Sequence, residues 1–206
     1  MTAPPTVFVV DDDPSMREAV GSLLRSVGME VRTFSSSQEF AQSPRPNAPG
    51  CLILDVRLHG ESGLDLQKEL SRSSSPLPII FISGHGDIPM TVSAMKAGAV
   101  EFLTKPFRDQ DLLDAVRIAV ELDRVRRKQA RSIGEVRTRF ASLSRREAEI
   151  LRLIADGMVN KQVAVALGIS EITVKVHRGH LMSKMKARTF AELMRMVGVL
   201  EAAVSS

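Results

Sequence analysis

Short apolar runs, each followed closely by a polar residue, set the pattern of the first 120 residues. Residues 7–10, 51–54 and 79–82 consist of Val, Ile, Leu, Phe and Cys, and a shorter run covers 101–103. Continuous apolar runs of this length are typical of strands that are buried on both faces of a parallel sheet. A fifth strand is expected at residues 30–34.

Helical signals fill the segments between these runs. Asp13-Pro14 predicts an N-cap and a first-turn proline for a helix over about residues 14–27, which Gly28 ends. We expect further helices after the serines at 35–37, up to about residue 70, over about 88–97, and from about 109 onwards. This alternation predicts a doubly wound α/β fold with a five-stranded parallel sheet and right-handed connections.

Five polar residues stand where these strands end. Asp11 and Asp12 follow the first run, and Asp55, Ser83 and Lys105 come at or just after the ends of three others. Because ligands of such sheets bind at the carboxyl ends of the strands, the five side chains are expected in one crevice. Neighbouring carboxylates favour a hard cation, and a hydroxyl and an ammonium beside them suggest a phosphoryl group. A single aspartate at a strand end is most often only a turn or helix cap.

In order and spacing, these residues resemble the receiver domain of bacterial two-component response regulators, over roughly residues 5–120. The resemblance implies that Asp55 accepts a phosphoryl group. It also implies that Mg²⁺, or Mn²⁺, is held by Asp11, Asp12, Asp55 and the backbone carbonyl of Arg57. A carboxylate nucleophile forms an acyl phosphate, which is labile and suits a reversible signal.

The same resemblance gives roles to residues around the phosphoryl group. Ser83 and Lys105 would contact its oxygens, Ser83 and Phe102 would form the switch, and the Lys105-Pro106 peptide bond would be cis. His59 departs from the family, because many members have proline there. His85 and Asp87 are expected to be polar loop residues rather than ligands or bases.

Composition indicates two domains in the cytoplasm. At 206 residues, the chain can hold one large or two small domains. Its single cysteine, Cys51, lies inside a predicted strand and is expected to pack as a small apolar residue. The N-terminus lacks the features of a signal peptide, and no apolar run is long enough to cross a bilayer, so no membrane contact is expected.

Charge separates the two halves. Residues 1–123 contain 11 Lys and Arg and 17 Asp and Glu, which gives a net charge of −6. Residues 124–206 contain 17 Lys and Arg and 7 Asp and Glu, which gives a net charge of +10. An acidic half followed by a basic half suggests that only the second half meets a polyanion.

The basic half has helical periodicity and no strand runs. Ser144 and Glu147 form a capping-box pattern at the start of one helix. Asn160 is expected to cap the next helix, over 161–167. After the turn at Gly168-Ile169, Ser170 is expected to cap a third helix that reaches about Met185. Such a pair of helices joined by a short glycine turn predicts a helix-turn-helix motif.

The sequences Leu143-Ser144-Arg145-Arg146-Glu147, Asn160-Lys161 and Thr173-Val174-Lys175-Val176-His177, together with Gly157, resemble the LuxR-type output domain. The whole chain therefore resembles the NarL/FixJ class of response regulators, with FixJ-like features. We expect a receiver domain over residues 1–120, a charged helical linker over 121–140 and a LuxR-type DNA-binding domain over 141–206.

Helical geometry separates two faces of the third helix. At 100° per residue, Val174, His177, Leu181 and Met185 fall on one side, which is the expected core.

The opposite side is the expected DNA-reading face. There Lys175 can donate to guanine, Val176 can contact a thymine methyl group, and Gly179 either permits close approach or removes a contact. Lys161, Thr173, Arg178 and Lys184 are better placed as phosphate contacts.

Two further segments leave alternatives open. Residues about 109–138 form either a rigid interdomain helix or a frayed linker, and Gly134 is expected to mark its end or a break. The last helix, over about 190–200, either completes the domain core or, by resemblance, pairs two output domains on DNA.

These features predict a phosphorylation-gated transcription regulator. A sensor histidine kinase would phosphorylate Asp55, and the output domain would bind double-stranded promoter DNA. The resemblance to FixJ-like receivers implies that the phosphorylated receiver forms a homodimer near Val92, Lys96 and Phe102. Activation, with RNA polymerase as a further partner, is the more common outcome in this class.

Two alternatives stand beside this interpretation. Asp11-x-Asp13 also resembles the nucleophile motif of haloacid-dehalogenase-type phosphohydrolases, but Asp55 and the basic half would then have no role. A receiver that works without phosphorylation, with constitutive DNA binding, is the other alternative.

Overall fold

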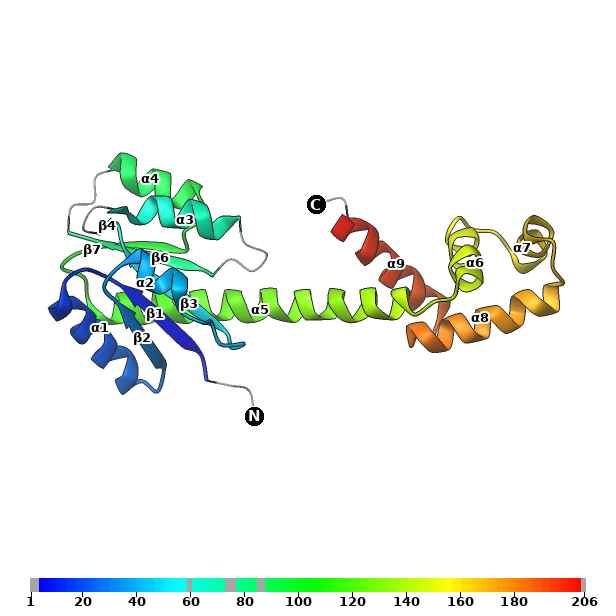
Figure 1. The fold of residues 1–206 in the computed structure, drawn as a ribbon, viewed down its shortest axis with the longest axis horizontal. Helices are drawn as coiled ribbons and strands as arrows, with labels where there is room; N and C mark the ends of the chain where they lie inside the picture. The colour runs from blue at the N-terminus through cyan, green and yellow to red at the C-terminus, as the bar shows by residue number, and fades with distance from the viewer. Residues whose placement is uncertain (1–3, 59–60, 73–76, 85–87, 205–206) are drawn as a thin grey trace. The chain divides into compact units, whose positions relative to one another are not determined.

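The computed structural model describes residues 4–58, 61–72, 77–84 and 88–204, so the expectations for His59, His85 and Asp87 lie outside the described residues. The chain divides into two compact units, Met1–Arg127 and Lys128–Ser206, which are considered separately (Figure 1). No helix within the described ranges has the length and apolar character needed to cross a membrane.

A five-stranded sheet forms the centre of the first unit. Its strands are β1 (Thr6–Val10), β2 (Glu30–Phe34), β3 (Gly50–Asp55), β6 (Ile79–Ser83) and β7 (Glu101–Thr104). All neighbours pair in parallel, in the order β2-β1-β3-β6-β7. The predicted doubly wound fold is confirmed, and the strand order reverses between β1 and β3, where such folds bind ligands.

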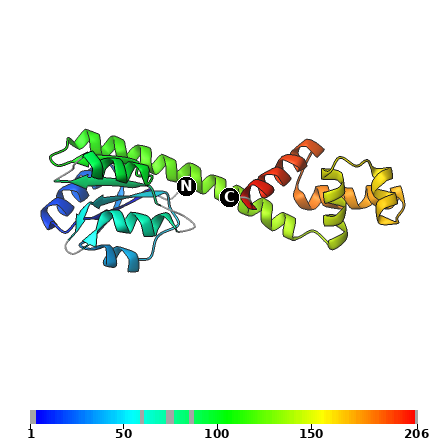
Figure 2. The same cartoon turned by 90° about the horizontal axis from the view of Figure 1, so that it is seen from above.

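Five helices cover the two faces of the sheet. They are α1 (Pro14–Ser26), α2 (Ser37–Gln42), α3 (Gly63–Ser71), α4 (Ile88–Lys96) and the first part of α5 (Asp109–Ala141). Helices α1 and α5 cover one face of the sheet, and α2, α3 and α4 cover the other (Figure 2). Asp13 caps α1 by accepting from the Ser15 backbone N–H at 2.8 Å, as predicted.

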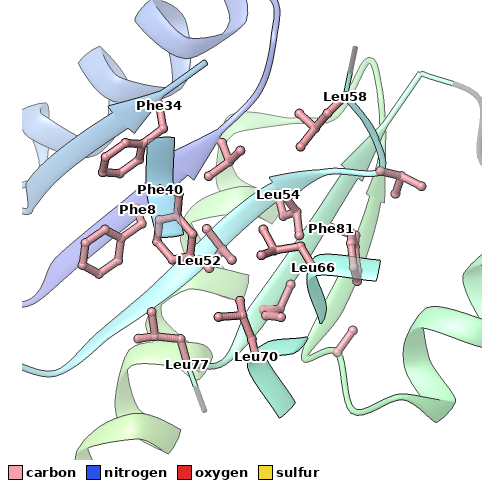
Figure 3. Packing of buried hydrophobic residues seen from close by; sticks show 14 of the residues in the cluster. Phe8, Phe34, Phe40, Leu52, Leu54, Leu58, Leu66, Leu70, Leu77 and Phe81 are labelled. Atoms are coloured by element: carbon pink, nitrogen blue, oxygen red, sulfur yellow. The ribbon is translucent and has the colours of Figure 1, made fainter. Parts of the chain in front are cut away.

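The core on the α2–α4 face is built around aromatic and leucine side chains. Phe40 from α2 meets the rings of Phe8 and Phe34 edge-on, with centroids 5.6 and 5.5 Å apart. Leu52 and Leu54 of β3 lie on the same face and carry the packing across the sheet (Figure 3). Because β3 is buried along its whole length, its last residue, Asp55, is held by packing on both sides.

A short hairpin that the apolar pattern did not predict follows Asp55. Strands β4 (Arg57–Leu58) and β5 (Glu61–Ser62) pair antiparallel, and α3 begins immediately afterwards. Gly63, the first residue of α3, lies against the Asp55 backbone, because a Cβ on Gly63 would come within 2.4 Å of the Asp55 carbonyl oxygen. The chain therefore turns closely under Asp55 only with glycine at this position.

One buried carboxylate ties α5 to the opposite end of β3. Asp123 is almost fully buried, and its Oδ2 accepts from the Gly50 backbone N–H at 2.9 Å and from Arg127 Nε at 2.6 Å. Its charge lies beside Cys51, where burial first and this carboxylate second raise the pKa of the thiol. Cys51 is thus an inert core residue, as expected.

We predict that Asp123→Ala lowers the free energy of unfolding of the first unit by about 1–3 kcal/mol, because a buried Gly50 N–H loses its acceptor. Scanning calorimetry of the full chain would measure this loss. Asp114→Ala, which removes an exposed carboxylate from the same helix, is the matched control and should change it by less than about 0.5 kcal/mol. Equal effects of the two substitutions would contradict the role of Asp123.

The second unit is helical. After the end of α5 it comprises α6 (Arg145–Ala155), α7 (Asn160–Leu167), α8 (Glu171–Met185) and α9 (Phe190–Val204). The Ser144–Glu147 capping box and the Ser170 cap are present, as predicted. The buried face of α8 carries Val174, Leu181 and Met185, whereas His177 is only half-buried. α9 contributes buried Leu193 to this core.

Two predictions about this unit were wrong. Asn160 does not cap α7: Val159 precedes the helix and donates its N–H to Gln162, while the Asn160 side chain accepts a hydrogen bond from Arg178 on α8. Gly134 neither ends nor breaks α5, which continues to Ala141. Val136 and Phe140 pack into the helical core beyond Gly134, and this packing offsets the roughly 1 kcal/mol that glycine costs inside a helix.

Candidate functional site

The polar residues expected in one crevice meet at the carboxyl edge of the sheet. Asp55 ends β3 and pairs in register with Ile82, so Ser83 is the next residue along the neighbouring strand. Asp11 directly follows β1, and Lys105 directly follows β7. Asp11, Asp55 and Ser83 are all buried, although each is polar. Parallel strands that end together thus collect residues that lie up to 94 positions apart.

Lys105 joins the two buried carboxylates. Its Nζ lies 2.7 Å from Asp11 Oδ2 and 2.6 Å from Asp55 Oδ2. The peptide bond from Lys105 to Pro106 is cis, as expected, and the Lys105 N–H donates to the Ser83 carbonyl at 2.8 Å. The ammonium is therefore fixed where it pairs with two carboxylates at once.

The ionisation of this cluster follows from its burial and from these contacts. Burial raises the pKa of Asp11 above its ordinary value, although hydrogen bonds from Lys105 and from the Asp13 backbone act in the opposite direction. Burial by itself would lower the pKa of Lys105, but the contacts with Asp11 and Asp55 outweigh it and raise that pKa. Lys105 therefore stays charged at neutral pH.

Three carboxylates at this edge form a site that suits a hard cation. Oxygen atoms of Asp11, Asp12 and Asp55 all lie within 4.8 Å of one another. Carboxylate oxygens are the ligands that Mg²⁺ prefers, usually with waters and a substrate phosphate completing the octahedron. The donor set therefore fits Mg²⁺ at the position that the sequence predicts.

The loop after Asp55 orients its carboxylate. Asp55 Oδ1 accepts the Arg57 backbone N–H at 2.9 Å, so each carboxylate oxygen has a fixed donor. The Gly63 N–H donates to the Val56 carbonyl at 2.9 Å and closes the turn beneath them. This turn places the Arg57 backbone N–H beside the Asp55 carboxylate.

Phe102 lies on the neighbouring strand as a half-buried aromatic residue. Its register partner is Phe81, and the two ring centroids are 6.2 Å apart. Phe102 packs against the α2–α4 core without being enclosed by it. An aromatic side chain at such a position can change rotamer when its surroundings change.

Two supporting residues had no signal in the sequence. Arg17 on α1 donates to the Asp11 carbonyl oxygen at 2.6 Å and so holds the loop that carries Asp11 and Asp12. Gly63 permits the close turn under Asp55. An arginine in a helix and a glycine in a loop are common, and only their tertiary contacts give them these roles.

The second unit presents a separate polar and basic surface. On α8, Lys175, Val176 and Gly179 are exposed, and Lys175 Nζ lies 3.6 Å from Glu171 on the same helix. Thr173 is half-buried, and its hydroxyl lies 2.8 Å from that of Ser170 in the cap of α8. This side of α8 is the one expected to face DNA.

Two of the basic residues expected to contact phosphates also bind within the domain. The Arg178 guanidinium donates to Asn160 and lies 5.5 Å from the centre of the Phe190 ring. Lys184 Nζ lies 2.6 Å from the buried Glu147 carboxylate. Lys161, in contrast, is exposed in the first turn of α7.

Known families match both units. The family described as "Response regulator receiver domain" matches residues 7–117. The family described as "Bacterial regulatory proteins, luxR family" matches residues 141–197. The first match covers the sheet with its carboxylate cluster, and the second covers the helix-turn-helix.

Full-length relatives match both units together. The chain is 58% identical to Nodulation protein W of Bradyrhizobium diazoefficiens, over 92% of this chain and 84% of that protein. It is 42% identical to the transcriptional regulatory protein FixJ of Azorhizobium caulinodans, over 92% and 90% of the two chains. The solved structure of the response regulator StyR is 50% identical, with a TM-score of 0.87 over 95% and 99% of the chains. The chain therefore belongs to the NarL/FixJ family of response regulators, in which phosphorylation of a receiver domain controls transcription through a LuxR-type DNA-binding domain.

Proposed function

We propose that Asp55 is the phosphoacceptor and that a sensor histidine kinase is the donor. The observation that carries this proposal is the bridge from Lys105 to Asp55 and Asp11 at the switch point of the sheet. The Asp55 carboxylate would attack the phosphorus of a kinase phosphohistidine. A phosphorus–oxygen bond forms as the phosphorus–nitrogen bond breaks, and the histidine leaves. Lys105 and Ser83 would then contact the transferred oxygens.

Asp11, Asp12, Asp55 and the Arg57 carbonyl would hold the metal. When bound, Mg²⁺ supplies positive charge against the repulsion between these carboxylates and the phosphoryl group. The chain's own contribution is positioning, because Arg17 fixes the Asp11 loop and the Arg57 N–H fixes Asp55.

A surface next to Lys105 fits a phosphodonor protein. Met16 and Leu23 of α1, with Pro106 and Phe107, line a pocket of about 170 Å³ that also includes Lys105. An apolar pocket that includes Lys105, the ion-pair partner of Asp55, can hold a side chain of the donor domain. This surface supports the proposal that a protein docks next to Lys105.

The phosphorylated receiver is proposed to dimerise through α4 and β7. On α4, Ile88, Val92 and Met95 are exposed and lie four and three residues apart, so they share one helix face. Phe102 of β7 packs beneath the same region, and Ala94 is the one buried residue described on α4. Because α4 is anchored by so little buried area, a shift of Ser83 and Phe102 can change its exposed face.

Val92→Asp should therefore leave Asp55 phosphorylation intact but weaken dimerisation at least about tenfold, because an unpaired charge would enter an apolar contact. Analytical ultracentrifugation with beryllofluoride and Mg²⁺ would measure the dimer. Val27→Asp is the control, because Val27, which directly follows α1, is a valine with the same 44% exposure. Undiminished dimerisation of Val92→Asp would exclude this face.

The output domain is proposed to bind double-stranded promoter DNA with α8 in the major groove. Lys175, Val176 and Gly179 would face the bases, while Lys161, Thr173, Arg178 and Lys184 would lie near phosphates. The basic charge of residues 124–206 supports this assignment. A regulator of this kind works in the cytoplasm, where the chromosome is, and RNA polymerase is a proposed further partner.

We assign residues 1–120 to the receiver, 121–140 to the linker and 141–206 to the DNA-binding domain. The division between the compact units falls after Arg127, inside the proposed linker.

A further inference from the structure

The outward face of α8 carries an apolar stripe that the domain core does not use. Ile172 is 74% exposed and Val176 is 52% exposed. With Gly179 they lie four and three residues apart, so they share one face of the helix. The opposite side of α8 packs into the core, where Val174, Leu181 and Met185 are fully buried.

Lys175 flanks this stripe, and exposed Ser183 continues it one turn beyond Gly179. At 100° per residue, Lys175 lies about 60° from Ile172 around the helix axis. Its ammonium is near Glu171. Gly179 continues the stripe without any side chain, and a Cβ there would meet nothing within 4 Å. Internal packing therefore does not require glycine, and its effect is to let another surface approach the helix closely.

The occupant that fits this face is the major groove of DNA. The helix belongs to a LuxR-type domain in the basic half of the chain, and the N-terminal residues of such a helix contact base edges. Among the base edges in that groove, only thymine presents a methyl group, and aliphatic side chains recognise it by apolar contact. Ile and Val are β-branched and stiff at χ1, so they offer a preformed contact surface.

We propose that Ile172 is a specificity-determining residue that acts together with Val176, each contacting one thymine 5-methyl group. This inference rests on the proposed placement of α8 in the major groove. Side chains four residues apart on a helix are about 5–6 Å apart, whereas successive bases rise by about 3.4 Å. The DNA segment bound by one α8 would therefore contain two thymines, on either strand, within about two base-pair steps.

The test begins with the full-length protein in beryllofluoride and Mg²⁺, which selects binding sites from random double-stranded DNA. Each thymine of the selected site is then replaced by uracil, which pairs identically but lacks the methyl group. Binding is measured by fluorescence anisotropy at one fixed salt concentration. We expect replacement at the two contacted positions to weaken binding about fourfold each, the loss for one apolar carbon.

Variants connect each methyl group to one side chain. In Ile172→Ala, one of the two uracil effects should disappear, and in Val176→Ala the other should disappear. Val165→Ala shortens an exposed aliphatic side chain on α7 and is the control, which should keep both effects.

Three results would decide against the inference. Selected sites that bind equally well with uracil, or an Ile172→Ala variant that keeps both methyl effects, would overturn it while leaving DNA binding intact. An unaltered protein that selects no sequence would overturn the proposed role of α8 and this inference together.

Discussion

Replacing Asp55 with asparagine is expected to abolish stable phosphorylation of the chain. The substitution is nearly isosteric, and the side-chain oxygen can still accept from the Arg57 N–H, so the fold should persist. The amide lacks the negative charge and nucleophilicity that phosphoryl transfer requires. Incubation with a small phosphodonor and Mg²⁺, followed by intact-mass measurement, would show the acid-labile adduct on the unaltered protein and none on Asp55→Asn.

Two controls make this result specific. Asp65→Asn, which changes an exposed carboxylate on α3, should be labelled normally. Chelation of Mg²⁺ should remove labelling of the unaltered protein, because Asp11, Asp12 and Asp55 would repel the incoming phosphoryl group. A stable adduct at position 55 of the Asp55→Asn variant would refute the assignment. Turnover of an aryl phosphate that is lost in Asp11→Asn would instead favour the phosphohydrolase alternative.

The second large effect concerns the output domain, where Lys184→Met is expected to destabilise the fold by about 2 kcal/mol at neutral pH. Glu147 is 3% exposed, and its carboxylate accepts from Lys184 Nζ at 2.6 Å and from the Ser144 N–H at 2.7 Å. The hydrogen bond from Lys184, with those from Ser144, lowers the pKa of Glu147 to about 2. Removing the ammonium leaves a buried carboxylate with one donor fewer.

The pH dependence of this effect has a definite sign. The ordinary pKa of Glu147 is 4.5, so the folded state binds fewer protons than the unfolded state between about pH 5 and 2. The stabilisation is therefore complete above about pH 5 and is lost as the pH falls towards 2. The difference between the unaltered chain and Lys184→Met should narrow over the same interval, which calorimetry at several pH values would measure.

Lys175→Met is the matched control for this prediction. Lys175 also lies on α8 beside a glutamate, but its side chain is 64% exposed and its nitrogen is 3.6 Å from Glu171. An exposed pair of this kind contributes about 0–1 kcal/mol. If the two lysine variants lost equal stability, the buried pair would not be the source of the effect.

The strands and the carboxylate cluster were predictable because their signals are local. A strand buried on both faces appears in the sequence as a continuous apolar run, and the first polar residue at the end of that run marks the end of the strand. Parallel strands bring those ends to one edge, so Asp11, Asp55, Ser83 and Lys105 could be placed together from the sequence alone. The caps at Ser144 and Ser170 were predictable for the same reason, because a cap is set by residues within three positions.

Where local signals were wrong, a distant contact had outweighed them. Asparagine is a good N-cap residue, yet the Asn160 side chain binds Arg178, 18 residues away, and the preceding Val159 takes the cap position. Gly134 has a low helix propensity, yet Val136 and Phe140 hold the helix beyond it. Helix propensities are worth about 1 kcal/mol or less per residue, and burial of one apolar side chain exceeds that.

The sequence by itself therefore determined the fold class, the two-domain order and the carboxylate cluster, because each depends on periodicity or on strand ends. Only the tertiary structure decided which groups hold that cluster in place. Arg17 on the Asp11 carbonyl, Gly63 under Asp55 and Asp123 at the opposite end of β3 are ordinary residues in the sequence. Their roles depend on contacts between segments that are far apart in the chain, and no local pattern records which distant group a side chain will meet.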